Sequence, residues 1–210
     1  MCRERNIYTM AELSLAFVKA FNVLNKEYFG GELPKVVITF EAGFKKGAFG
    51  WINTAKQWKQ GSAERYRINL SSDYLDRPII DIVSTLLHEM CHLYAIINEI
   101  QDTSRSGIYH NKKFKQIAEA HCLDVREADK IGWSVTSVRP DLAEHILQLV
   151  SISSIRIGQK RPSDLGGGKS TKTKQSSRKY ICPCCGLIVR ATKECRIKCM
   201  ECDIEMECEA

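Results

Sequence analysis

An apolar segment in the middle of the chain carries three titratable side chains. From about Pro78 to Glu99 the sequence is apolar almost all round a helix, which predicts a central, buried helix. His88, Glu89 and His92 lie inside this run. Burying such groups costs several kcal/mol unless a partner satisfies them. The fold must therefore be built round a buried polar site, either a structural pair of core histidines or a metal site.

The spacing of these residues favours a metal. Four residues along a helix bring His88 and His92 nearly to the same face, about 6 Å apart along the axis, so both imidazoles can reach one ion. Glu89 is offset by about 100° and stands beside that ion, where it can hold a water molecule. This HExxH arrangement is typical of zinc hydrolases.

A catalytic zinc needs a third protein ligand and an open position for water. His110 is the preferred candidate, because the polar loop before it contains Gly107 and can turn the chain back towards the helix. His121 is the main competitor, although its neighbours suit a core histidine, and Glu119 is a weaker alternative. His145 is interpreted as structural.

The remaining patterns predict an α+β domain. Thr9 and Glu12 form a capping box before a long helix that ends at Gly30. Short β-branched and aromatic runs predict a small antiparallel sheet, and periodic apolar residues predict two further helices with one strand between them. The predicted strands are 36–40, 47–52, 65–71 and GWSVTSV, and the helices are 111–122 and one that begins at Pro140.

The cysteines predict a second metal site. Seven of the ten cysteines lie between Cys182 and Cys208. Because the N-terminus does not resemble an export signal, this cluster favours metal binding over disulfides. Two CxxC pairs thirteen residues apart are a strong signal for one tetrahedral structural zinc. A redox CxxC is a weaker interpretation, because no βαβ pattern surrounds it. The expected ligands are Cys182, Cys185, Cys199 and Cys202, which leaves Cys184, Cys195 and Cys208 spare.

The positive charge is concentrated near the C-terminus. Residues 1–155 hold 19 Lys and Arg against 18 Asp and Glu, whereas residues 156–210 hold 12 against 7. Residues 156–179 contain eight Lys or Arg, one acid and much Gly, Ser and Thr, which predicts a flexible basic linker. Such a linker before a zinc ribbon suggests DNA binding through phosphate contacts, a solvated charge run being the alternative. Partner binding by the ribbon is equally compatible.

Neither a signal peptide nor a membrane span is expected. The N-terminus has charges where a signal peptide needs apolar residues, and no run reaches the roughly 18 to 20 apolar residues of a span. We therefore expect a cytoplasmic protein that does not enter a membrane.

HEMCH, the loop after it and GIYHNKKF together resemble the SprT-like family of zinc metalloproteases, over about residues 9–150. The resemblance implies a zincin-like domain with His88, His92 and His110 as zinc ligands and Glu89 as the catalytic carboxylate. A C-terminal zinc ribbon often follows the protease domain in this family, which agrees with the cysteine pattern. The expected organisation is a protease domain at 1–155, the linker at 156–179 and a four-cysteine zinc ribbon at 180–210. Eukaryotic members of this family cleave proteins crosslinked to DNA.

Two functions follow from these patterns. The first is a zinc endopeptidase with one catalytic and one structural zinc, in which Glu89 is the general base and an extended protein substrate pairs with a sheet edge. The second is a non-catalytic zinc-binding factor associated with nucleic acid or transcription. The first is favoured, because a structural zinc site has no use for Glu89 and normally closes with a fourth protein ligand.

Overall fold

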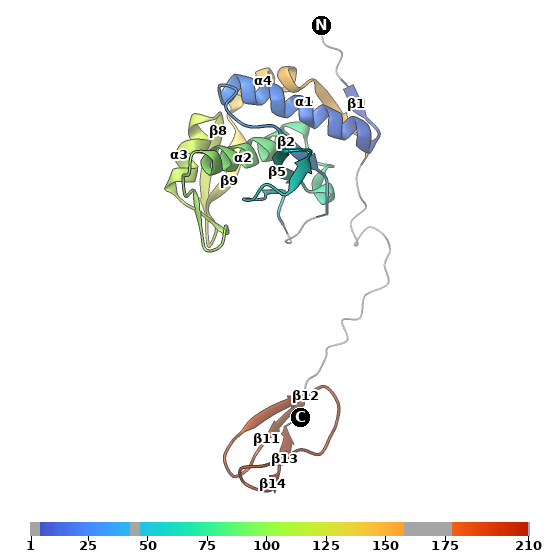
Figure 1. Ribbon diagram of the computed structural model, residues 1–210, viewed down its shortest axis with the longest axis vertical. Coiled ribbons are helices and arrows are strands. Elements are labelled where there is room, and N and C mark those ends of the chain that lie inside the picture. The colour runs from blue at the N-terminus through green and yellow to red at the C-terminus, as the bar shows by residue number, and fades with distance from the viewer. Residues whose placement is uncertain (1–4, 43–46, 158–177, 210) are drawn as a thin grey trace. The chain divides into compact units, whose positions relative to one another are not determined.

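The computed structural model describes residues 5–42, 47–157 and 178–209 (Figure 1). The chain divides into two compact units, Met1–Arg161 and Pro162–Ala210. Most of the predicted linker, residues 158–177, lies outside the described residues. The mixed helices and sheets confirm the predicted α+β class.

The first helix begins as the sequence predicts. In the capping box of α1 (Met10–Tyr28), the Thr9 side chain accepts the backbone N–H of Glu12, and the Glu12 carboxylate accepts the backbone N–H of Thr9. This pair satisfies N–H groups that the first helical turn leaves without partners. Gly30 and Gly31 follow with positive φ, a conformation that glycine adopts without steric cost and that ends the helix.

The second helix, α2 (Ile79–Ile97), is the centre of the first unit (Figure 1). Most of it is buried, including Leu86, Leu87 and Met90. By length and composition it could cross a membrane, but the core helix of a globular domain passes the same test. Because it packs against both sheets and α3 (Lys112–Ala120), side chains on different faces of α2 reach different layers.

One sheet of the first unit packs against α2. Its strand order is β2-β5-β3, with β4 also paired to β5. The predicted antiparallel sheet is wrong in one respect: β2 runs parallel to β5, with Val36 opposite Tyr66, whereas β3 and β4 are antiparallel to it. The strands are β2 (Val36–Thr39), β3 (Gly50–Ile52), β4 (Trp58–Gln60) and β5 (Ala63–Leu70), and the 3-10 turn η1 (Ser72–Tyr74) leads on to α2.

A second sheet, with strand order β6-β7-β9-β8, lies against α2 and α3. Three of its strands were not predicted; the fourth, β9, is the predicted GWSVTSV. The strands are β6 (Thr103–Ser104), β7 (Tyr109–His110), β8 (Leu123–Ala128) and β9 (Gly132–Val138).

The last elements of the first unit pack against its first elements. The turn η2 (Pro140–Leu142) leads into α4 (Ala143–Val150), which packs against α1. The following strand, β10 (Ile152–Ile155), pairs in parallel with β1 (Arg5–Ile7). Ile7, Ile146 and Ile152 thereby join the same hydrophobic core as α1 and α2.

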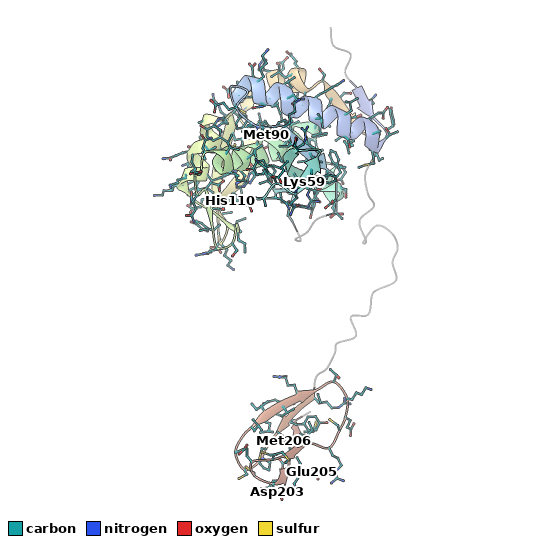
Figure 2. The ribbon with its side chains drawn as sticks, viewed as in Figure 1. Lys59, Met90, His110, Asp203, Glu205 and Met206 are labelled. Atoms are coloured by element: carbon teal, nitrogen blue, oxygen red, sulfur yellow. The ribbon has the colours of Figure 1, made fainter. Side chains whose placement is uncertain are left out.

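The second unit is a small β module built round four cysteines. It has a three-stranded sheet, β12-β11-β15, and a two-stranded one, β13-β14. Its core consists of Tyr180, Cys182, Cys199 and Met206, the last labelled in Figure 2. The strands are β11 (Arg178–Ile181), β12 (Ile188–Ala191), β13 (Lys198–Cys199), β14 (Ile204–Glu205) and β15 (Glu207–Glu209).

Candidate metal centre

Three imidazole rings converge on one point beside α2. The Nε2 atoms of His88 and His92 are 3.1 Å apart, and those atoms lie 3.2 and 3.1 Å from Nε2 of His110. The three residues form a group able to hold one metal ion. Three nitrogens bound tetrahedrally to zinc at its usual bond length would be about 3.3 Å apart. The spacing of the rings therefore fits a zinc-sized ion.

The outer nitrogens of the rings show why a cation belongs there. Nδ1 of His92 is 2.5 Å from an Asp102 carboxylate oxygen, and Nδ1 of His110 is 3.4 Å from the carbonyl oxygen of Ile131. An ionised carboxylate and a carbonyl only accept hydrogen bonds, so both rings carry their proton on Nδ1. Their Nε2 lone pairs then face each other without a proton between them. A bound cation removes that repulsion.

The ring of His88 is held by Thr136. Its Nδ1 lies 3.0 Å from Oγ1 of Thr136 on β9, and the Thr136 carbonyl in turn accepts a hydrogen bond from Ser84 on α2. Each ring therefore has a partner on its outer nitrogen. Such outer contacts fix the ring orientation and the tautomer of a histidine ligand. Sequence analysis identified neither Asp102 nor Thr136.

His110 reaches the site because β7 folds back beside α2. Its backbone N–H donates to the Ile131 carbonyl at 2.9 Å, and it pairs with Thr103 on one side and Gly132 on the other. A Cβ on Gly132 would lie 2.2 Å from the His110 carbonyl oxygen, and φ is +70° at this position. Only glycine therefore allows β9 to approach His110 so closely.

Phe114 forms the apolar floor of the site. Its ring is fully buried, and its centroid lies 4.6, 4.6 and 4.7 Å from the rings of His88, His92 and His110. Contact with all three imidazoles restricts their side-chain rotation before any ion arrives. Preorganisation of this kind keeps the geometry of a site fixed.

Burial favours the neutral form of two of the imidazoles, those of His88 and His110. It lowers the pKa of His88 well below its usual value and lowers that of His110 to about 4, with the neighbouring His92 contributing in both cases. Neutral imidazole is the form that binds metal.

Glu89 lies on the same helix and is almost completely buried, with 4% of the residue exposed. Burial raises its pKa to about 7; the charge on Asp102 adds to this effect and His92 opposes it. A Cβ at Gly50 on β3 would lie 3.1 Å from the Glu89 Oε1 atom and 2.9 Å from Thr85. The absence of a side chain at position 50 thus leaves room beside the carboxylate.

The other candidates for a third ligand lie elsewhere. The His121 ring stacks on Phe29 at 4.2 Å and its Nδ1 is 2.7 Å from the Ile117 carbonyl oxygen. Glu119 pairs with Lys115 at 3.6 Å. His145 lies 3.3 Å from a Glu27 carboxylate oxygen. The structure therefore brings only His110 to the HExxH pair among the residues weighed from sequence.

A second group of possible metal ligands lies in the C-terminal unit. The sulfurs of Cys182, Cys185, Cys199 and Cys202 all lie within 4.8 Å of one another. Gly186 follows the first pair with φ +71°, and its N–H donates to the Cys182 carbonyl at 2.9 Å, which closes the first knuckle. This four-cysteine cluster could form a zinc ribbon. Cys184, Cys195 and Cys208 are exposed and outside the group.

Comparison with known proteins gives one match. The sequence model of the SprT-like family matches residues 18–128, more than half of the chain. The matched stretch contains all three histidines and Glu89 but ends before the four-cysteine cluster. No curated protein and no solved structure matches the chain significantly.

Proposed function

Because the chain belongs to the SprT-like family, we propose that its first unit is a zinc-dependent metalloprotease that cleaves peptide bonds internally. One observation carries this proposal: the Nε2 atoms of three imidazoles lie within 3.2 Å of one another beside a buried glutamate. A second zinc in the four-cysteine cluster would stabilise the ribbon.

Each residue of the site has a separate task. A zinc ion held by the three histidines would acidify a water molecule and polarise the peptide carbonyl. Glu89 accepts the proton of the attacking water and returns it to the leaving amine. Asp102 and Thr136 keep the imidazoles turned towards the reaction centre.

The substrate would bind as an extended strand along β3. This strand pairs with β5 on one side, and no described strand pairs with its other side. Backbone hydrogen bonds to such an edge bind a polypeptide with little dependence on its sequence. Because Gly50 lies on β3 and a Cβ built on it would lie 3.1 Å from the Glu89 Oε1 atom, a strand paired there would run past the catalytic carboxylate.

We assign nucleic-acid contacts to the linker rather than to the ribbon. Residues 156–179 contain eight Lys or Arg and one acid, whereas residues 180–210 contain four Lys or Arg and six acids. In the ribbon, Arg196 and Lys198 pair with Glu205 and Asp203. Two of the eight cations of residues 156–179, Arg178 and Lys179, lie on β11 and pair with Glu194 and Glu209, which leaves six in the linker. Phosphate binding depends on cations that are available to it, and the linker holds most of them. Proteins bound to DNA are therefore a proposed substrate class.

The test compares the wild type with Glu89→Gln on a chemically unfolded protein, with and without single-stranded DNA. Glu119→Gln is the matched control, because Glu119 is a surface glutamate paired with Lys115. We expect Glu89→Gln to keep its zinc and lose cleavage by a factor of about 10² or more, while the control cleaves normally. Equal cleavage by Glu89→Gln, or none by zinc-loaded wild type on either substrate, would reject the proposal.

A further inference from the structure

An aromatic side chain next to the strand residue that approaches Glu89 is exposed and yet held in place. Phe49 immediately precedes Gly50 and is 45% exposed. Single exposed apolar side chains are common and need no explanation. Two features separate Phe49 from other exposed apolar residues: its ring has defined partners, and the residue after it, Gly50, approaches the Glu89 carboxylate.

The first feature is a clamp formed by Arg77 and Tyr74. The Arg77 guanidinium lies over the Phe49 ring at 4.0 Å from its centroid, and the Tyr74 ring contacts Phe49 edge-on at 4.9 Å. Arg77 is itself fixed, because it donates hydrogen bonds to the Tyr74 carbonyl at 3.0 Å and to the Thr85 hydroxyl at 3.1 Å. A ring held in this way loses little further entropy when a ligand packs against it.

The second feature is the position of the neighbouring backbone. The Phe49 carbonyl accepts the N–H of Ser71 at 2.8 Å, which fixes the start of β3 to the end of β5. The next residue, Gly50, lies against both Thr85 and Glu89. Thr85 thus touches the strand at Gly50 and also accepts a hydrogen bond from Arg77. The clamp and the catalytic carboxylate are therefore connected through one short stretch of α2 and β3.

Exposed apolar side chains also lie close to His110. Ile131 binds the backbone of His110 through its carbonyl oxygen, and its side chain is exposed. Ile108, two residues before His110, is exposed as well. Exposed apolar side chains next to Gly50 and near His110 in the chain fit a substrate that has apolar side chains of its own.

We propose that Phe49 is a specificity-determining residue, whose clamped ring forms a platform for an aliphatic or aromatic substrate side chain near the scissile bond. This inference rests on the proposed protease function. It assigns the substrate class as unfolded or extended polypeptide that exposes apolar residues. Arg77 is a positioning residue, because it acts on the substrate only through Phe49.

The experiment maps the bonds cleaved in a chemically unfolded protein by mass spectrometry, for the full chain loaded with zinc. Variants are Phe49→Ala, Phe49→Trp and the control Trp58→Ala. Trp58 is equally exposed, at 45%. Its cross-strand partner on β5 is Arg65, whereas the partner of Gly50 is Leu70, five residues further along β5. That spacing corresponds to roughly 17 Å of strand.

We expect wild-type cleavage sites to be enriched in apolar residues at one fixed position relative to the scissile bond. Phe49→Ala should remove this enrichment, and Phe49→Trp and Trp58→Ala should retain it. For a pair of peptides with Leu or Gly at that position, the ratio of kcat/KM should fall about 10- to 100-fold in Phe49→Ala. The fall should appear mainly in the Leu peptide, which a general loss of structure would not produce.

The role of Arg77 is tested by a double-mutant cycle. If Arg77 acts through Phe49, then Arg77→Ala should lower the Leu-to-Gly ratio in the wild type but have little further effect on Phe49→Ala. Arg77→Lys should restore part of the ratio, because a lysine can also lie over the ring.

Each outcome decides between the two proposals. Enrichment that is absent from the wild type, or unchanged in Phe49→Ala, overturns the platform and leaves the protease function standing. Complete absence of cleavage by zinc-loaded wild type overturns the protease function and the platform with it.

Discussion

Nδ1 of His92 donates a hydrogen bond of 2.5 Å to Oδ2 of Asp102, a carboxylate ten residues further along the chain. Asp102 is nearly buried, and its contact fixes both the tautomer and the ring plane of His92. The loop between α2 and His110 is thus part of the metal centre. It contributes Asp102, which holds a ligand, although none of its own residues is a predicted ligand.

Removing this carboxylate should weaken metal binding. We predict that Asp102→Ala lowers zinc affinity about 10- to 100-fold, the usual cost of losing an outer partner of a histidine ligand. Asp102→Asn should cost less, because an amide oxygen still accepts the Nδ1–H. Competition with a chelator of known affinity measures both. Equal affinity for wild type and Asp102→Ala would mean that Asp102 has no such role.

Glu89 should make the metal-free protein less stable at alkaline pH. Its pKa is raised to about 7 in the fold, against 4.5 when exposed, so the folded state binds more protons than the unfolded state between these values. Its contribution to stability is complete below pH 4.5 and is lost as pH rises through 7. Glu89→Gln should therefore stabilise the metal-free protein at pH 8, by on the order of 1 to 3 kcal/mol.

Thermal unfolding of metal-free wild type and Glu89→Gln at pH 8 and pH 4.5 checks this prediction. The difference in Tm should favour Glu89→Gln at pH 8 and shrink at pH 4.5. A difference that is independent of pH would show that the buried carboxylate is not the cause. Loss of activity together with gain of stability is expected of a residue retained for catalysis.

The ribbon should depend on its four cysteines and on no others. Cys199 is buried within the group, so Cys199→Ser should remove one zinc per chain and unfold the second unit. Cys195→Ser is the matched control, because Cys195 is exposed and lies outside the group. Metal analysis and amide hydrogen exchange separate the two units. Persistence of both zinc ions in Cys199→Ser would exclude the assigned ligand set.

Nucleic-acid binding, if carried by the linker, should follow the linker charges. Replacing Lys169, Lys172 and Lys174 with Gln should lower the slope of log affinity against log salt for single-stranded DNA by about 2. Replacing Arg190, Lys193 and Arg196 of the ribbon with Gln should change this slope much less. Titrations at several salt concentrations give both slopes. A larger effect from the ribbon variant would reverse the assignment.

Local signals predicted the helices and the HExxH pair well. The capping box at Thr9 defined the start of α1, and continuous apolar sequence defined α2 to within two residues at each end. His110 was preferred because the loop before it can turn back, and the structure brings its ring to the pair. These features depend on neighbours in sequence, so sequence patterns contain them.

Features set by distant contacts were not predicted. The parallel pairing of β2 with β5 depends on how the chain crosses between them and leaves no mark on either strand. Asp102 lies in a stretch that reads as a polar surface loop, and only the fold brings it to His92. Gly132 is the first residue of the predicted strand GWSVTSV, but its contact partner, His110, lies 22 residues away, so the strand pattern does not reveal the contact.

The zinc content of the purified full-length chain, compared between the wild type and His110→Ala, tests the central claim most directly. His121→Ala is the control, because that ring packs on Phe29 away from the site. We predict about two zinc ions per chain for the wild type and the control and about one for His110→Ala, since two histidines alone hold zinc weakly. One zinc in the wild type, or two in His110→Ala, would contradict a centre built from His88, His92 and His110.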